Sequence, residues 1–293
     1  MKSETDTTLS AIFDILAEVH TCHGPTTKTF EFLERVCREA FTASRRGSDA
    51  NVFYETGKFG RIRWPFLHMG SVSSTDIFSS LNELIIFTFY YANRHRYHRI
   101  ADIGANIGLH TVLMSSLGWK VKAYEPDPKH IVHLKRNMNL NKFPIDEIHE
   151  IAVSDNSGSS EFVRVLGNTT SSHIAGSKES PFGELERIAV KTMDIRDIVP
   201  HVDFIKIDAE GHERILIECL SAEHFENLDM IVEVGSVKNA CAIYDHLSSQ
   251  GINAFSQKIG WQRAKSCSDI PSNYKEGSLF ISKHPLMPWP SID

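Results

Sequence analysis

The sequence has few cysteines, and their spacing fits neither a disulfide framework nor a zinc site. Among 293 residues there are only five, an odd number, without any C-x-x-C pair: Cys22, Cys37, Cys219, Cys241 and Cys267. Scattered cysteines of this kind are typical of reduced thiols. The polar and acidic start, MKSETDTTLS, does not resemble a secretory signal peptide. We therefore expect a cytoplasmic protein.

Long hydrophobic runs and an excess of positive charge are also lacking. The longest apolar run lies near residues 84–92, far short of the roughly 20 residues that a membrane-spanning helix needs. Lys and Arg number 31 against 37 Asp and Glu, so the formal net charge is −6. Nucleic-acid-binding proteins usually present a basic surface. We expect neither a membrane span nor a nucleic-acid partner.

The chain does contain a strand–turn–helix–strand pattern. Ile100–Ile103 is a short apolar strand, Gly104–Gly108 is a turn, and apolar residues at helical spacing continue to Gly118. A second strand, Val121–Tyr124, is stopped by Glu125–Pro128. Parallel strands joined by a helix form a right-handed crossover. The turn then lies at the carboxyl edge of the sheet, where open α/β sheets bind ligands.

Residues in and after this turn favour an adenosine-containing ligand without a diphosphate. Gly104 and Gly108 permit a sharp turn that can approach a ligand closely, and the helix N-terminus after them can bind an anionic group. Glu125 follows Gly104 by 21 residues, where a carboxylate can bind a ribose diol. The dinucleotide-binding pattern requires glycine where this chain has Asn106 and Leu109.

Asp102 decides between the remaining cofactors. Its carboxylate, directly before the turn, would attract an ammonium or sulfonium group and would repel a diphosphate. The pattern D-x-G-x-N-x-G, followed by Glu125-Pro126, therefore indicates S-adenosylmethionine. The alternatives are a glycine turn in some other α/β protein and a nicotinamide-dependent oxidoreductase.

Charged residues mark the end of another predicted strand, Val202–Gly211. Strand alternation puts Lys206, Asp208 and Glu210 on one face. Charges in a central strand are costly unless they are paired or used in chemistry. We expect Asp208 or Glu210 to deprotonate an acceptor hydroxyl, with Lys206 orienting the carboxylate or stabilising an oxyanion. A purely structural Lys206–Asp208 pair is the alternative, and a divalent cation on Asp208, Glu210 and Glu233 is a less favoured variant.

Other segments are predicted to surround this site. A helix is expected from Asp76 up to the first strand, with Glu83 either solvated or reaching the cofactor's amino group. Residues 148–153 form a third strand whose end borders the adenine. The long loop within residues 160–190, between two added strands, either folds over the acceptor or is a disordered surface loop.

The chain is predicted to hold one large domain with extensions at both ends. Residues 1–72 contain two amphipathic helices, at 8–20 and 28–42, and a hairpin. We expect this extension to cap the main domain, residues 73–285, or to form a homodimer. The proline-rich tail, residues 286–293, is expected to be loosely held.

Four segments resemble the FkbM family of S-adenosylmethionine-dependent methyltransferases. They are DIGANIGLHT (102–111), YEPDP (124–128), IAVSDNSG (151–158) and KIDAEGHE (206–213). The resemblance covers about residues 75–283. It implies an α/β, Rossmann-like class I fold, with a seven-stranded, mostly parallel sheet whose last strand is antiparallel. It also implies O-methylation of a glycan or a small natural product.

The resemblance also implies roles for single residues. The turn residues would hold the methionine end of the cofactor, Glu125 would bind the ribose, and Ala152 and Val153 would border the adenine. The acceptor would be faced by Lys206, Asp208 and Glu210. These three charged residues argue against the alternative of a cofactor-binding module without catalysis. The full expected cofactor set is Glu83, Asp102, Gly104, Ala105, Asn106, Gly108, Thr111, Glu125, Pro126, Ala152, Val153 and Asp208.

Overall fold

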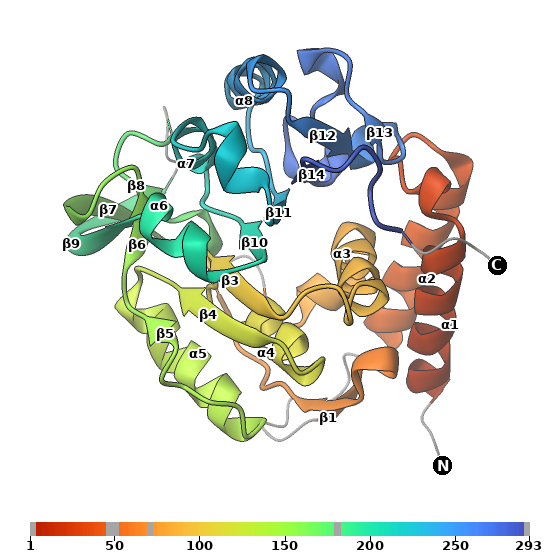
Figure 1. The fold of residues 1–293 in the computed structure, drawn as a ribbon. Helices are drawn as coiled ribbons and strands as arrows, with labels where there is room; N and C mark the ends of the chain where they lie inside the picture. The colour runs from red at the N-terminus through yellow and green to blue at the C-terminus, as the bar shows by residue number, and fades with distance from the viewer. Residues whose placement is uncertain (1–3, 45–52, 70–72, 179–182, 290–293) are drawn as a thin grey trace.

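The computed structural model describes residues 4–44, 53–69, 73–178 and 183–289. A mixed sheet of eight strands crosses its centre, in the order β13-β12-β14-β11-β10-β3-β4-β5 (Figure 1). The strands are β3 (Arg99–Ile103), β4 (Lys120–Tyr124), β5 (Ile148–His149), β10 (Phe204–Ile207), β11 (Asp229–Val232), β12 (Asn253–Ser256), β13 (Gln262–Arg263) and β14 (Leu279–Ser282). Strand β14 is antiparallel to both of its neighbours. The Rossmann-like α/β fold is thus confirmed, with the short β13 added at one edge.

Helices cover both faces of this sheet. Helices α3 (Leu81–Ala92), α4 (Leu109–Ser116) and α5 (Pro128–Leu140) share one hydrophobic core with one face. Helices α6 (Ile195–Ile198), α7 (Glu213–Glu218) and α8 (Val237–Ser249) share a second core with the other. Successive residues of a central strand, such as Phe204 and Ile205, belong to opposite cores. This explains why the central strands of the sheet are mostly apolar, with Asp102 in β3 and Lys206 in β10 as buried charged exceptions.

Helix α3 begins later than the sequence suggested. Residues Asp76–Ser79 form a separate 3₁₀ turn, η3, and Ser80 is extended, with ψ at 116°. The Asp76 carboxylate accepts hydrogen bonds from the backbone N–H and the hydroxyl of Ser73, each at 2.8 Å. These bonds close a local turn in place of a helical one. The expectation of one helix from Asp76 was therefore wrong.

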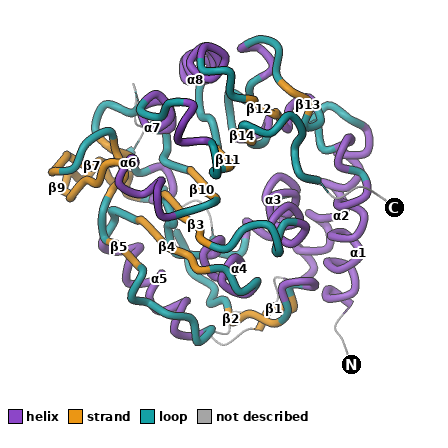
Figure 2. Tube along the Cα trace, in the orientation of Figure 1, coloured by secondary structure: helices purple, strands orange, loops and turns teal. Residues whose placement is uncertain are grey.

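The third predicted strand is divided between two sheets. Residues 148 and 149 extend the main sheet as β5, whereas Ala152–Ser154 forms β6 in a second sheet of order β6-β9-β7-β8. A tight turn, in which the Ile151 N–H donates to the His149 carbonyl at 3.0 Å, separates them. The other members are β7 (Gly158–Leu166), β8 (His173–Ile174) and β9 (Glu184–Asp194), and Figure 2 shows them projecting from one side of the molecule.

The N-terminal helices pack onto the main domain. Helices α1 (Glu4–Glu18) and α2 (Lys28–Ser44) contact α3, and strands β1 (Phe53–Glu55) and β2 (Arg61–Arg63) form the expected hairpin. Phe13 and Leu16 of α1 are buried in the same core as α3. Both helices therefore pack against the main domain in this structure. Among the described residues, no helix combines the length and apolar character that crossing a bilayer would require.

The C-terminal tail is ordered further than expected. The Trp289 ring stacks on His20, with centroids 5.8 Å apart and planes 11° apart, and meets Phe89 edge-on at 5.5 Å. The Pro288 carbonyl accepts a hydrogen bond from Asn93 at 2.9 Å. The expectation of a loosely held tail was wrong as far as Trp289, because its aromatic ring packs against the domain. Residues 290–293 lie outside the described part of the chain.

Candidate cofactor and acceptor site

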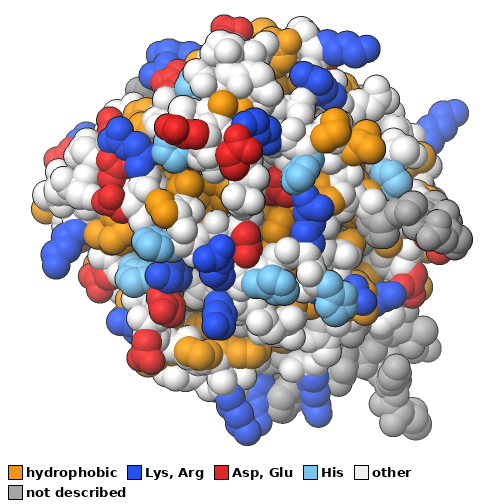
Figure 3. Space-filling model, viewed as in Figure 1, with side chains coloured by type: hydrophobic (Ala, Val, Ile, Leu, Met, Phe, Trp, Pro, Cys, Tyr) orange, Lys and Arg blue, Asp and Glu red, His pale blue; other side chains and the backbone are white. Residues whose placement is uncertain are grey.

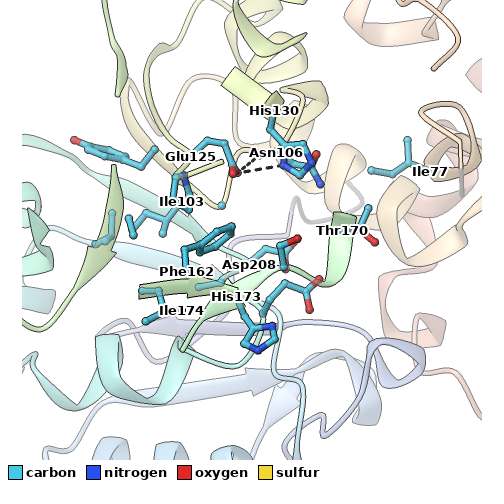
Figure 4. Close-up of a pocket in the computed structure, with 18 residues that line it drawn as sticks. Ile77, Ile103, Asn106, Glu125, His130, Phe162, Thr170, His173, Ile174 and Asp208 are labelled. Carbon is cyan, nitrogen blue, oxygen red and sulfur yellow. Dashed lines mark hydrogen bonds and ion pairs between the residues drawn. The ribbon is translucent and has the colours of Figure 1, made fainter. Parts of the chain in front are cut away.

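A cavity of about 200 Å³ lies at the carboxyl ends of β3, β4 and β10. Its opposite wall comes from the second sheet (Figure 4). The residues that line it are Ile77, Ile103, Gly104, Asn106, Tyr124, Glu125, Pro126, His130, Ala152, Val153, Phe162, Thr170, Ser172, His173, Ile174, Asp208, Ala209 and Glu210. The cavity thus joins the glycine turn, the acidic end of β4 and the Asp208–Glu210 segment, which are far apart in the sequence.

Glu125 is held in place before any ligand binds. Its carboxylate accepts hydrogen bonds from the backbone N–H groups of Asn106 and Asp127, both at 2.8 Å. The His130 Nδ1 atom lies 3.5 Å from the same carboxylate. Figure 4 shows the interactions of Glu125 with Asn106 and His130 as dashed lines. Asn106 has φ of +52°, which turns its N–H toward Glu125. Glu125 as a whole is only 4% exposed, and its carboxylate is therefore fixed at the cavity wall.

The two glycines of the turn serve protein packing. Gly104 has φ of +76°, and a Cβ there would lie 1.9 Å from the Asp208 carbonyl oxygen. Gly108 has φ of +90°, and a Cβ there would lie 2.0 Å from Leu134 Cδ1 of helix α5. From the sequence, these glycines were expected to let a ligand approach closely. In the structure, their space is needed by the backbone just after β10 and by Leu134 within α5.

Asp102 lies beneath the turn and is fully buried. One oxygen, Oδ2, accepts a hydrogen bond from the Thr111 hydroxyl at 2.6 Å. The other, Oδ1, has no hydrogen-bond partner and lies 3.9 Å from the Lys206 Nζ atom. Four residues of the expected cofactor set do not line the cavity: Asp102, Ala105, Gly108 and Thr111. Thr111 therefore acts on Asp102, which has one oxygen left to bind a cation.

The Lys206–Glu210 segment does not continue as a strand. Strand β10 ends at Ile207, and Glu210 has φ of +51°, so the expected alternation of Lys206, Asp208 and Glu210 on one strand face was wrong. The Glu213 carboxylate stabilises the turn by accepting from the backbone N–H groups of Ala209 and Gly211, at 3.1 and 2.9 Å. The turn still directs Asp208 and Glu210 to the cavity.

Lys206 lies behind the cavity wall. It is 7% exposed, does not line the cavity, and its Nζ atom is 3.4 Å from Asp208 Oδ2. Burial opposes its charge, but the surrounding carboxylates, Asp208 and Asp102 above all, raise the pKa of Lys206 above its usual value. It therefore remains an ammonium group and can orient Asp208.

Asp208 raises the pKa values of carboxyl groups near it. Burial and the charge of Asp208 raise the pKa of Glu210 to about 7, although its ion pair with Lys178 opposes this shift. The charge of Asp208 and burial also raise the pKa of Glu233 well above its usual value.

Among the described residues, no group of three or more His, Cys, Asp or Glu side chains is arranged to hold a metal ion. Asp208, Glu210 and Glu233 are therefore not arranged as such a group in this part of the chain.

Sequence reasoning missed one wall of the cavity. Phe162 of β7 and Ile174 of β8 are paired across the second sheet and present apolar surface to the cavity. A buried ion pair supports this wall, because both Arg164 Nε and Nη2 donate to the Asp127 carboxylate at 2.7 Å. An added strand was predicted beside the long loop, but nothing local indicated that this strand faces Glu125.

Glu83 also lies away from the cavity wall. Its Oε2 atom is 3.1 Å from His110 Nε2, and the ammonium of Lys206 is close enough to affect its pKa. The structure therefore places Glu83 near Lys206 and His110, behind the glycine turn.

On the face that Figure 3 shows, Lys, Arg, His, Asp and Glu side chains are interspersed.

Comparisons with known proteins agree with this architecture. The family model described as "Methyltransferase FkbM domain" matches residues 102–250, just over half of the chain. No protein of curated function matches the sequence.

Solved structures give weak similarities. The ribosomal protein L11 methylase from Lactobacillus delbrueckii subsp. bulgaricus has 15% identity and a TM-score of 0.35, over 67% of this chain and 78% of that chain. The O-methyltransferase from Bacillus cereus in complex with SAH has 11% identity and a TM-score of 0.35, over 73% and 83%. The hMettl16 catalytic domain in complex with MAT2A 3'UTR hairpin 6 has 13% identity and a TM-score of 0.39, over 78% of both. These TM-scores are too low to support any inference about this chain.

Proposed function

Because this chain belongs to the FkbM methyltransferase family, we propose that it transfers the methyl group of S-adenosylmethionine to a hydroxyl oxygen of a glycan or a small natural product. The observation that carries the proposal is the cavity between the glycine turn, Glu125 and Asp208. It combines a carboxylate suited to a ribose diol with acidic groups suited to a hydroxyl acceptor.

Buried polar atoms without partners fit the cofactor. Asp102 Oδ1, Asn106 Oδ1 and His130 Nε2 are buried and make no hydrogen bond. Leaving such atoms unpaired costs free energy, so each favours a ligand that supplies its partner. Asp102 and Asn106 would bind the methionine end, and Glu125 would bind the ribose. Val153 and Phe162 offer an apolar surface to the adenine.

The mechanism follows from the charges around Asp208. The bound cofactor supplies an electrophilic methyl group with a good leaving group, so the protein mainly has to align the acceptor. Asp208 or Glu210 would take the proton of the acceptor hydroxyl. The Lys206 ammonium, at 3.4 Å from Asp208, would hold that carboxylate or stabilise the developing oxyanion.

Three accompanying expectations stay predictions. The acceptor is not expected to be nucleic acid, which the net charge of −6 and the interspersed charges of Figure 3 support. A homodimer through the N-terminal helices and a cytoplasmic location are also expected. Light scattering and fractionation of cells would test the last two.

Calorimetry and an assay for methyl release test the function together. We expect purified protein to bind S-adenosylmethionine and its demethylated product, and to turn over with a glycan or natural-product hydroxyl. Asp208→Asn and Lys206→Met should each lower kcat by about 100-fold or more, while binding of the demethylated product remains measurable in both variants.

Three results would contradict the proposal. If the protein binds neither form of the cofactor, the cofactor assignment fails; tight binding of a nicotinamide dinucleotide instead would favour the oxidoreductase alternative. If it binds cofactor but both variants keep full turnover, the catalytic assignment of Asp208 and Lys206 is wrong. Binding without any methyl release would indicate a module without catalysis.

A further inference from the structure

Behind the glycine turn, three side chains form a hydrogen-bonded chain that has no part in the mechanism above. The Tyr90 hydroxyl lies 3.0 Å from His110 Nδ1, and His110 Nε2 lies 3.1 Å from Glu83 Oε2. Tyr90 and Glu83 belong to α3, whereas His110 belongs to the first turn of α4. Tyr90 is fully buried and His110 is 9% exposed. Polar groups this deeply buried are retained at a cost unless they are fully paired.

One protonation state satisfies the whole chain. A carboxylate can only accept, so the proton of a neutral His110 must be on Nε2, which donates to Glu83. Nδ1 then accepts from the Tyr90 hydroxyl. Burial and nearby carboxylates raise the pKa of Tyr90 well above its usual value, so this hydroxyl keeps its proton. The Glu83 carboxylate thus fixes the tautomer of His110, the Tyr90 hydroxyl stabilises that tautomer by donating to Nδ1, and His110 in turn orients Glu83.

The neighbour of His110 does the same for a second carboxylate. Thr111 donates to Asp102 at 2.6 Å, so consecutive residues of α4 orient Glu83 and Asp102. Both carboxylates, together with Asp208, influence the charge of Lys206. Burial opposes the charge of Glu83, but the hydrogen bond from His110 and the Lys206 ammonium lower its pKa. Three carboxylates around one ammonium leave negative charge for a second cation.

We propose that His110 and Tyr90 are positioning residues that hold the Glu83 carboxylate for the α-ammonium group of the cofactor. The proposal rests on the proposed function, since it assumes that S-adenosylmethionine binds at this turn. It extends that function to His110, which contacts Glu83, and to Tyr90, which contacts His110; neither residue lines the cavity.

The affinities of each variant for two ligands show whether its substitution disturbs the position of Glu83 or the stability of the whole protein. S-Adenosylhomocysteine carries the amino-acid tail, whereas 5′-methylthioadenosine has the same nucleoside and sulfur without it. We expect Glu83→Gln and His110→Leu to weaken binding of S-adenosylhomocysteine about tenfold or more, and binding of 5′-methylthioadenosine less than about twofold. Tyr90→Phe should give a smaller loss with the same selectivity. His110→Gln, whose amide can still donate to Glu83, should restore part of the affinity.

A matched control is available on α3. Thr88 is 3% exposed and its hydroxyl donates to the Leu84 carbonyl of its own helix at 2.7 Å, so Thr88→Val removes a buried hydroxyl without touching Glu83. It should leave both affinities unchanged. Should His110→Leu not fold, Glu83→Gln and Tyr90→Phe still decide the matter.

The outcomes are distinct. Equal losses for both ligands in the His110 and Glu83 variants, or no loss for either, would overturn the positioning role while native protein still binds S-adenosylhomocysteine. Native protein that binds neither ligand would instead overturn the proposed function, and this inference with it.

Discussion

At the scale of single residues, crowded carboxylates govern the chemistry of the cavity edge. Asp208 keeps Lys206 charged and makes it harder for Glu210 to lose its proton. The ion pair with Lys178 acts on Glu210 in the opposite direction. A carboxyl group with a pKa of about 7 is well suited to accept a proton near neutral pH. Glu210 therefore has the properties expected of a general base.

This balance predicts a pH dependence for methyl transfer. If Glu210 is the base, kcat/KM should rise as pH increases through about 7, because only the deprotonated form accepts a proton. Lys178→Met removes the cation that lowers this pKa, so the midpoint should move to higher pH, while Lys178→Arg should stay near the native value. A midpoint that is the same in all three proteins, measured by initial rates, would assign the base to another residue.

At the scale of elements, the glycine turn joins three parts of the fold. Gly104 allows the end of β3 to meet the end of β10, and Gly108 allows α4 to pack against α5. The turn therefore fixes Asp208 and Glu125 relative to each other, and it does so through packing between elements. Replacing a glycine of this turn should therefore lower the free energy of unfolding according to how closely the neighbouring element packs against it.

Two glycine substitutions test that interpretation. Gly104 and Gly118 both have positive φ, but a Cβ would collide with the Asp208 backbone only at Gly104, since nothing lies within 4 Å at Gly118. Gly118→Ala should cost about 1–2 kcal/mol for its left-handed conformation alone. Gly104→Ala should cost roughly 3 kcal/mol or more. Denaturant unfolding of both variants measures the difference, and equal costs would mean that the close approach is easily relieved.

At the scale of the whole molecule, the N-terminal helices are part of the methyltransferase core. Phe13 and Leu16 share one buried cluster with α3 and with strand residues such as Phe204. The tail reaches the same region, where Trp289 packs against His20 and Phe89. Both ends of the chain thus cover one side of the sheet (Figure 1).

This shared core predicts that the extension and the sheet unfold together. Leu16→Ala should lower the free energy of unfolding by about 2–5 kcal/mol, in a single transition seen by both near-UV and far-UV dichroism. Its neighbour Ile15 is 42% exposed, so Ile15→Ala should cost no more than about 0.5 kcal/mol. A separate early transition in Leu16→Ala would show that residues 1–72 form an independent unit.

The sequence alone determined the parts whose signals are local. Strand β3, the turn, α4, β4 and Glu125 lie within about thirty consecutive residues, so apolar periodicity, the glycines and the acidic stop were enough to predict them. The same contiguous motifs identified the family that the comparison confirmed. The order of these elements predicted the right-handed crossover, because a βαβ unit has only one favoured handedness, and the family resemblance implied the rest of the main sheet.

Tertiary structure alone decided the features that need contacts between distant segments. The second sheet brings Phe162 opposite Glu125, Trp289 covers α3, and His110 meets Glu83 from a neighbouring helix. Periodicity tells which face of an element is buried but not which partner buries it. Those partners are selected by packing and by the need to pair buried polar groups, and both depend on the folded chain as a whole.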